Sequence, residues 1–441
     1  MSNYINIKST LPKNEIPYTL DENWKWYKWG DIIQDYQQGL VRSNSELNDD
    51  YSIEYFKMNF INENGDYSFK GLPKTEASQD EILRYKIKEG DFFINVRNSR
   101  ELVGKTCAIY NVLRDIVFNH MLVRIKHKNY ITGTFMSAYF NTKFGKQILE
   151  TCKKGTTTVI ALYQKDLYNL PVPIPNEKLL KKIDKIYNNI NKKIQLLHQI
   201  NDNLAELAKT IYDYWFVQFD FPDENGKPYK TSGGKMVYNE VLKREIPEGW
   251  EVKSLGEIET NIITGKTPPT KDENNFNGNI LFITIDDIRQ NLFIYNSERT
   301  LSEKGANTQR AKFLKKGDIC VSCIGTVGVI GIVGKIAQTN QQINSISNPQ
   351  NFNKYFLLNY LDRYFKDNFT AKKGAVLDNM NKAEFESIII INPIQNIKEI
   401  YYGKVKFLYE KIDTNIQQIQ HLQSLRDWLL PMLMNGQISV E

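Results

Sequence analysis

The sequence is poor in cysteine and has no long apolar run. Four cysteines occur in 441 residues, and they are Cys107, Cys152, Cys320 and Cys323. Because so few cysteines cannot build a disulfide framework for a chain of this length, we expect a reducing compartment. No stretch of about 18 uncharged apolar residues is present, and residues 1–15 lack the apolar core of a signal peptide. These absences predict a cytoplasmic protein without a membrane segment.

Motifs for catalysis and cofactor binding are also missing. The four histidines are scattered, so no metal site or catalytic triad is visible. Cys320 and Cys323 form one CxxC without a second pair, and cysteines in the core of a strand explain it better than zinc. In "TGKTPP" Thr260 stands where a phosphate-binding loop requires glycine. "NPIQ" does not supply the Asn-Pro-Pro-aromatic tetrad of an adenine methyltransferase. We predict no catalytic residue, metal or cofactor on this chain.

Two glycine-containing stretches are interpreted as turns. "PDENGK" (222–227) faintly resembles a nuclease pattern of carboxylates and lysine, but it lies in a connection rich in proline and glycine. "IGTVGVIGIVG" (324–334) has its glycines among β-branched residues, which is typical of tight turns between strands. Some backbone amides of the second stretch could still touch phosphates.

An internal duplication dominates the sequence. The segment around Trp24 and Gly30 recurs around Trp250 and Gly256 with a constant offset of 226. Further along, "KIKEGDFFINV" matches "FLKKGDICVSC", and "KDLYNLPVPIP" matches "KAEFESIIIINP", where the offset has fallen to about 218. Because this period is too long for a solenoid and the chain is too long for one core, we expect two tandem copies of one domain with its tail.

Each copy has the pattern of a mixed domain that ends in a long helix. Apolar runs such as "DFFINV", "MLVRI" and "GVIGIV" are punctuated by Gly, Asn and Pro, which is typical of strands joined by turns. We predict an α+β fold of two tandem mixed α/β domains, each followed by a long helix, with the two helices forming an antiparallel coiled coil. The expected boundaries are 1–175 (first domain), 176–218 (central helical arm), 219–246 (linker), 247–393 (second domain) and 394–441 (C-terminal helical arm).

The two long helices carry matching heptad seams, in which apolar positions alternate in steps of four and three. The predicted seam residues are Ile190, Ile194, Leu197, Asn201, Leu204, Leu408, Ile412, Asn415, Ile419 and Leu422. In an antiparallel pair Asn201 would face Asn415 and fix the register at some cost in stability. The alternative is that each asparagine lies in water at the edge of the seam. Arg426 interrupts the second seam where the first has Ala208.

The ends of both helices are rich in large apolar residues. "IYDYWF" (211–216) has more aromatic residues than one face of a two-stranded coil can bury, and "LLPMLM" (429–434) is similarly rich. We expect another subunit or the mixed domains to cover part of this surface. Packing within the chain at the ends of the arms is the alternative.

Several stretches together resemble the specificity (S) subunit of type I restriction-modification systems over nearly the whole chain. They are "GWEVKSLGEI" followed by "ITGKTPPT", the inter-repeat "PYKTSGGKMVYNEVLKREIPEGW" (228–250), "TNQQINSI" (339–346), and the helix endings "LAKTIYDYWF" (207–216) and "WLLPMLMNGQI" (428–438). The first copy departs from this pattern, because "NWKWYKWGDIIQDYQQGLVRSNS" is more aromatic and lacks the "TGKTP" turn.

The resemblance implies a non-catalytic DNA-recognition subunit whose two target-recognition domains each read one half of a bipartite, asymmetric target. The implied partners are double-stranded DNA, two DNA methyltransferase (M) subunits and the restriction motor-nuclease (R) subunits, which would bind S-adenosylmethionine, ATP and magnesium. Other readings stay open. They are a specificity chain of a related defence or methylation-only system, a DNA-acting enzyme, and a coiled-coil assembly protein that does not read DNA.

The candidate DNA contacts are polar side chains in loops next to predicted strands, since such groups read base edges or bind phosphates. In the second copy they are Lys266, Thr267, Thr270, Lys271, Arg289, Gln290, Asn340, Gln341, Gln342, Lys372 and Lys373. In the first copy they are Arg42, Ser43, Asn44, Arg97, Asn98, Arg100, Lys105, Asn119, His120, Lys153 and Lys154. The formal net charge of +6 is compatible with a polyanionic partner. An ordinary solvated residue is the alternative at each position, and "TNQQ" is the strongest candidate because four consecutive polar side chains serve no core.

Overall fold

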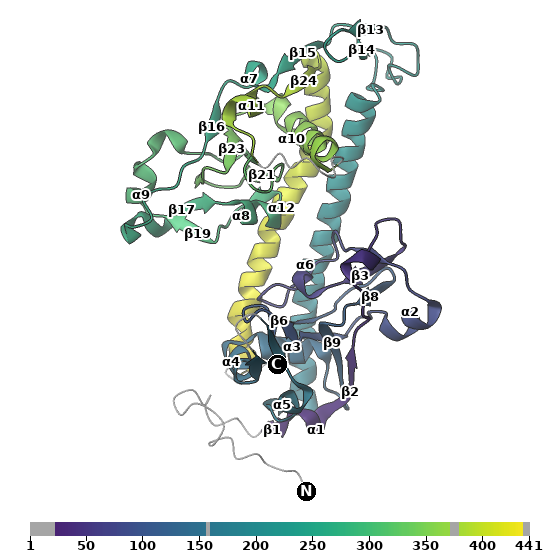
Figure 1. The fold of residues 1–441 in the computed structure, drawn as a ribbon, viewed down its shortest axis with the longest axis vertical. Coiled ribbons are helices and arrows are strands. Elements are labelled where there is room, and N and C mark those ends of the chain that lie inside the picture. The colour runs from purple at the N-terminus through teal and green to yellow at the C-terminus, as the bar shows by residue number, and fades with distance from the viewer. Residues whose placement is uncertain (1–22, 156–158, 371–378, 435–441) are drawn as a thin grey trace. The chain divides into compact units, whose positions relative to one another are not determined.

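The computed structural model describes residues 23–155, 159–370 and 379–434. The chain forms two compact units (Figure 1). Unit 1 combines residues 1–196 with residues 419–441, and unit 2 comprises residues 197–418. Both long helices contribute to both units, so the units do not follow chain order, and the domain boundaries given above stay predictions. In the described parts of the chain, none of the helices has the length and apolar character needed to cross a bilayer.

Unit 1 is a mixed domain of short strands and helices. Its strands are β1 (Trp24–Lys28), β2 (Ile33–Gln38), β3 (Ile53–Phe56), β4 (Lys74–Thr75), β5 (Phe92–Asn95), β6 (Arg97–Asn98), β7 (Thr106–Ala108), β8 (Ile116–Phe118), β9 (Leu122–His127), β10 (Lys153–Gly155), β11 (Ile160–Leu162) and β12 (Pro171–Pro175). Its helices are α1 (Trp29–Ile32), η2 (Asn44–Glu46), η3 (Met58–Phe60), α2 (Gln79–Tyr85), α3 (Gly133–Asn141), α4 (Lys143–Thr151), α5 (Gln164–Tyr168) and the first part of α6 (Glu177–Tyr212). The strand orders are β2-β9-β5-β7, β4-β3-β8, β10-β11-β6 and β1-β12.

The core of unit 1 contains a cluster of packed aromatic rings. The ring of Trp29 lies 4.4 Å from that of Phe140 and 6.1 Å from that of Phe92, measured between centroids. Its Nε1 atom donates a hydrogen bond to Nε2 of the buried His127 at 3.0 Å. Leu433, near the end of the last helix, is buried in the same cluster. The C-terminal helix therefore completes the core of the first domain.

Unit 2 has the same kind of architecture. Its strands are β13 (Met236–Asn239), β14 (Arg244–Pro247), β15 (Glu251–Ser254), β16 (Ile262–Thr264), β17 (Phe276–Ile283), β18 (Phe293–Ile294), β19 (Arg299–Leu301), β20 (Ile319–Ser322), β21 (Ile330–Val333), β22 (Ala337–Thr339), β23 (Ile343–Ile346) and β24 (Ile389–Asn392). Its helices are the second part of α6, η4 (Asp213–Val217), α7 (Leu255–Ile258), η5 (Glu273–Asn275), α8 (Ile285–Gln290), α9 (Glu303–Asn307), η6 (Arg310–Lys312), α10 (Asn351–Phe365), η7 (Lys366–Thr370), α11 (Lys382–Glu386) and most of α12 (Gln395–Met434). The strand orders are β16-β23-β20-β21-β18, β19-β17-β22, β15-β24 and β13-β14.

The topology confirms the internal duplication. The order β16-β23-β20-β21 in unit 2 repeats the order β2-β9-β5-β7 in unit 1, and β19-β17-β22 repeats β4-β3-β8. In the latter pair of sheets the central strand has one antiparallel and one parallel neighbour in both units. Helices α1 and α7 begin 226 residues apart, and α5 and α11 begin 218 residues apart. The predicted fold of two mixed domains, each followed by a long helix, is confirmed.

Inside unit 2 the two long helices run antiparallel. Nδ2 of Asn415 donates a hydrogen bond to Oδ1 of Asn201 at 2.8 Å. Further along, the ring of Tyr401 lies 6.3 Å from that of Tyr212. The two asparagines thus face each other as the seam predicts, whereas coiled-coil packing along the full helices stays a prediction. Of the predicted seam residues, Ile194, Leu197, Leu408, Ile412, Asn415 and Ile419 are buried, and Ile190, Asn201, Leu204 and Leu422 are half-buried.

Aromatic residues of η4, which directly follows α6, pack inside unit 2. The ring of Phe216 lies 4.9 Å from that of Phe356 and 5.9 Å from that of Trp250. Trp215 is buried in the same cluster. Burial within the unit therefore accounts for these aromatic residues, as it does for Leu433 in unit 1.

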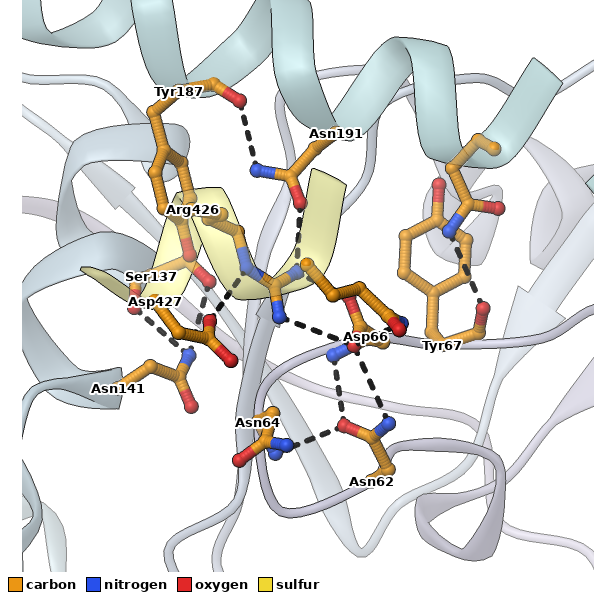
Figure 2. A network of polar contacts seen from close by, with 12 residues as sticks. Asn62, Asn64, Asp66, Tyr67, Ser137, Asn141, Tyr187, Asn191, Arg426 and Asp427 are labelled. Atoms are coloured by element: carbon orange, nitrogen blue, oxygen red, sulfur yellow. Dashed lines mark hydrogen bonds and ion pairs between the residues drawn. The ribbon is translucent and has the colours of Figure 1, made fainter. Parts of the chain in front are cut away.

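Arg426 is a buried part of unit 1 and not an interruption of its packing (Figure 2). Its side chain is 2% exposed and forms an ion pair with Asp66. Nη1 also donates to Oδ1 of Asn191 at 3.0 Å, and Nε donates to Oδ1 of Asp427 at 3.0 Å. Asn191 in turn donates to the carbonyl oxygen of Tyr187 at 2.8 Å. This network joins α6, α12 and the loop that carries Asp66.

Two stretches that suggest chemistry in the sequence are structural. Cys320 lies in β20 and Cys323 directly follows it, and both thiols are buried and free. Burial raises the pKa of Cys320 to about 12. In "PDENGK" the backbone closes a turn, with N–H of Asp223 bonded to the carbonyl of Lys227 at 2.8 Å and Gly226 at a φ of 75°. The turn that the sequence indicates at 222–227 is confirmed, and the two cysteines lie in and directly after a buried strand.

Candidate nucleic-acid interface

The first part of the site in unit 2 is the loop that follows β16. N–H of Lys266 donates to the carbonyl of Thr339 at 2.9 Å, which fastens the loop to the end of β22. The hydroxyl of Thr267 donates to Oε1 of Gln341 at 2.7 Å. Gly265 is required here, because a Cβ atom would lie 2.1 Å from the carbonyl oxygen of Asn340. The fold thus brings "TGKTP" and "TNQQ" together.

The turn between β20 and β21 extends this edge. A Cβ atom on Gly325 would lie 3.6 Å from Nε2 of Gln342, so the turn borders the "TNQQ" segment. The hydroxyl of the next residue, Thr326, accepts a hydrogen bond from Arg289 at 2.5 Å. Arg289 also pairs with Asp286 at 2.7 Å. We call this contiguous edge the unit 2 polar face, and it comprises Lys266, Thr267, Arg289, Gly325, Thr326, Asn340, Gln341 and Gln342.

Two lysines on the loop after β16 have free charges. Lys266 and Lys271 are exposed, and no hydrogen bond or ion pair joins either ammonium group to another described residue. Thr270 and Gln290 are exposed as well, but no polar contact links their side chains to the unit 2 polar face within the described residues. Lys372 and Lys373 lie outside the described residues. Exposed, unpaired lysines are suited to phosphates, whereas the amides of Gln341 and its neighbours are suited to base edges.

The corresponding loop of unit 1 is held by an ion pair. The Arg42 guanidinium binds the carboxylate of Glu81 at 2.9 Å and the carbonyl of Glu76 at 3.2 Å. Because these groups occupy the guanidinium, Arg42 holds the loop in place, and its contact with DNA stays a prediction. Ser43 and Asn44 are exposed beside it, and Lys57 donates to Oδ1 of Asn44 at 3.3 Å.

Asn119 is also committed to the fold of unit 1. It is 3% exposed, its Nδ2 donates to the hydroxyl of Tyr55 at 2.8 Å, and its Oδ1 accepts from N–H of Met121 at 2.7 Å. Both ends of the Asn119 amide are thus bonded inside the domain, and its contact with DNA stays a prediction. The sequence alone does not distinguish it from Asn340, its counterpart in the second copy, which is only half-buried.

The remaining candidates of unit 1 form a basic edge. His120 and Arg97 are close, since burial and then the positive charge of Arg97 lower the pKa of His120. The Arg97 guanidinium is exposed, and Lys105 is half-buried; neither side chain forms a hydrogen bond or ion pair with another described residue. Asn98, half-buried, accepts a hydrogen bond from the backbone of Ser99.

Three further basic residues of unit 1 have acidic neighbours. Arg100 pairs with Glu150 at 2.6 Å, and Lys153 pairs with the same carboxylate at 2.8 Å. Lys154 pairs with Asp166 at 2.6 Å. The side chains of Arg100 and Lys154 stay mostly exposed, so their pairs are weak, whereas that of Lys153 is 10% exposed and also binds the carbonyl of Arg100. Lys153 is therefore the least accessible of the three.

Sequence reasoning missed Lys57 and Thr326. Lys57, which directly precedes η3, reaches Asn44, and Thr326 reaches Arg289 from a glycine-rich turn. The sequence indicates the turn at Thr326 but not its neighbour Arg289, because Arg289 comes from α8, 37 residues earlier in the chain. Within the described ranges, no group of three or more histidine, cysteine, aspartate or glutamate side chains could hold a metal ion.

Residues 21–206 and 247–424 match the model of the type I restriction modification DNA specificity domain. The chain is 29% identical to the type I restriction enzyme HindI specificity subunit of Haemophilus influenzae, over 94% of this chain and 100% of that protein. It is 26% identical to the MjaIX specificity subunit of Methanocaldococcus jannaschii, over 78% of this chain and 77% of that protein. The fold is similar to that of the type I restriction-modification S subunit from M. genitalium, with a TM-score of 0.51 and 15% identity over 95% of this chain and 98% of that chain.

The chain is therefore of the class of proteins that carry two DNA specificity domains in tandem, each followed by a long helix. The chain belongs to the type I restriction-modification DNA specificity family.

Proposed function

We propose that this chain is the DNA-recognition subunit of a type I restriction-modification complex and that each unit reads one half of a bipartite, asymmetric target. The observation that carries the proposal is the duplicated polar edge. In unit 1 the strand β2 ends beside the turn between β8 and β9. In unit 2 the strand β16 ends beside the turn between β22 and β23. The side chains displayed at the two turns differ. Unit 2 presents amides at Gln341 and Gln342, and unit 1 presents Arg97 and His120. Different side chains on one scaffold are suited to two unlike half-sites.

The chemistry in this proposal belongs to partner subunits. Two M subunits would methylate the DNA with S-adenosylmethionine, and R subunits would move and cut it with ATP and magnesium. Exposed apolar side chains on the long helices support partner binding, since Phe407 of α12 is 69% exposed in unit 2 and Trp428 is 58% exposed in unit 1. The proposal places the chain in the cytoplasm with its DNA.

A methylation map of host DNA with and without the gene tests this function. We expect N6-methyladenine to disappear at one split, asymmetric motif when the gene is deleted and to return when it is restored. A lost motif without restriction of unmodified DNA would identify a methylation-only system. An unchanged map, in cells where the complex is produced, would contradict the proposal and favour an assembly protein that does not read DNA.

A further inference from the structure

Two buried glutamines lie beneath the unit 2 polar face. Gln309 follows α9 and is 7% exposed, and Gln338 lies in β22 and is 0% exposed. Glutamine is rarely buried to this extent, because its amide must find partners inside the protein. The hydrogen-bond partners of these two side chains show which part of the fold they stabilise.

The two amides form a relay from the body of the domain to the loop after β16. Nε2 of Gln338 donates to the carbonyl of Ala306 at 2.9 Å, and its Oε1 accepts from Nε2 of Gln309 at 2.7 Å. Nε2 of Gln309 also donates to the carbonyl oxygen of Lys266 at 2.7 Å. A loop carbonyl that would otherwise bind water is therefore fixed by a buried side chain.

A second buried amide fixes the other end of the same short segment. Nδ2 of Asn275 donates to the carbonyl of Pro269 at 3.0 Å. Only Thr267 and Pro268 lie between the two anchored carbonyls, and the hydroxyl of Thr267 holds Gln341. The position of the exposed Gln341 amide thus depends, through Thr267, on the buried amides below. Restricting a contacting group before binding lowers the entropy cost of binding and sharpens the choice of partner.

We propose that Gln309, braced by Gln338, is a positioning residue that sets the base preference of the half-site read by unit 2. This inference rests on the proposed function, because it requires Gln341 to contact DNA. In unit 1 the corresponding loop is held by the ion pair between Arg42 and Glu81, whose side chains are 17% and 31% exposed. The two half-sites would then be tuned by different groups, one buried and neutral and the other charged and partly exposed.

The test compares methylation motifs in cells that produce the whole complex with one altered chain. Gln309→Met keeps the length of the side chain but removes the donor to Lys266. We expect assembly and methylation to persist, while methylation at sites with one wrong base in the unit 2 half rises by about tenfold, the size of one lost base discrimination. The other half of the motif should stay unchanged. Gln341→Ala in the same assay identifies which half unit 2 reads.

Asn353→Leu is the matched control for a loss of stability. Asn353 is buried and donates to Oε1 of Glu259 at 2.8 Å, but it lies near the opposite end of β16 from Lys266. It should lower stability without changing the motif. If it relaxes the same half-site as Gln309→Met, the effect is general and the inference fails. If Gln309→Met does not fold, Gln309→Asn, which keeps the amide but shortens its reach, replaces it with the same expectation.

The outcomes separate this inference from the proposed function. A motif that changes with Gln341→Ala but not with either Gln309 variant would overturn the positioning role and leave DNA reading intact. A motif unaffected by Gln341→Ala would overturn both. A relaxed half-site with Gln309→Met, absent from Asn353→Leu, would support both.

Discussion

Unit 1 and unit 2 share one fold, but polar groups join the mixed domain to the long helices differently in each. In unit 1 the buried Arg426 of α12 binds Asp66 of the mixed domain and Asn191 of α6. At the offset of 218, Ala208 corresponds to Arg426 and Tyr409 corresponds to Asn191. The other copy therefore has Ala208 and Tyr409 where the network has Arg426 and Asn191, so this network is not repeated there.

Unit 2 has a different and more exposed cluster. Asp413 of α12 pairs with Lys316 at 2.9 Å and accepts a hydrogen bond from the hydroxyl of Tyr295 at 2.5 Å. The Lys316 side chain is 58% exposed. Buried charges are costly to leave unpaired, whereas exposed pairs contribute little. Duplicated domains can therefore keep the same fold and still differ in how much a single polar contact contributes to stability.

The largest expected effect is at Arg426. Arg426→Met should destabilise unit 1 by about 3–5 kcal/mol, because it leaves the Asp66 carboxylate without its buried partner. Hydrogen exchange of peptides from unit 1, followed with increasing urea, measures the change. Peptides from unit 2 serve as the internal control. Equal acceleration in both units, or no change, would contradict the role assigned to the network.

The second-largest expected difference between the units is in their stability at acidic pH. Burial lowers the pKa of His127 to about 3, against about 6.5 in an unfolded chain, so below pH 6.5 the unfolded state binds the additional proton. Unit 1 should therefore lose about 2 kcal/mol of stability between pH 6.5 and pH 5, and the loss should continue until pH approaches 3. Urea unfolding of the wild type and of His127→Gln, which keeps an acceptor for Trp29, measures it. A slope that is the same in both proteins would rule out His127 as the source.

The asparagine pair of unit 2 should show a smaller, non-additive effect. Asn415→Leu alone should cost about 1 kcal/mol, because it leaves the half-buried Asn201 amide without its partner. Replacing both asparagines with leucine should restore or exceed wild-type stability while loosening the register. Thermal unfolding of the single and double variants forms a double-mutant cycle. Additive losses would show that the hydrogen bond between them is irrelevant.

The smallest effect is expected at Lys316. Lys316→Met should destabilise unit 2 by about 0.2–1 kcal/mol, since its ion pair is largely solvated. The same hydrogen-exchange assay used for Arg426 provides the measurement. A loss of stability as large as that caused by Arg426→Met would contradict the expected difference between a buried and an exposed ion pair.

The sequence predicted the features that repeat and failed where distant side chains meet. The duplication, the mixed domains, the long helices and the facing Asn201 and Asn415 follow from periodicity and spacing. The pairing of Arg426 with Asp66 does not, because the two residues are 360 positions apart in the chain. The sequence does not show the partners of Arg42 and Asn119 for the same reason, since Glu81 and Tyr55 are brought to them only by the fold. Nothing in the sequence singles out Gln309, because its proposed role depends on its hydrogen bonds to Lys266 and Gln338, which only the fold brings near.

The central claim is that each unit reads its own half of one DNA target. Single-molecule methylation mapping of cells that carry the wild-type chain, Gln341→Ala or Arg97→Ala tests it most directly. The account predicts that Gln341→Ala changes one half of the split motif, that Arg97→Ala changes the other half, and that the spacing stays constant. Variants that both alter the same half, or that lower methylation uniformly at an unchanged motif, would contradict it.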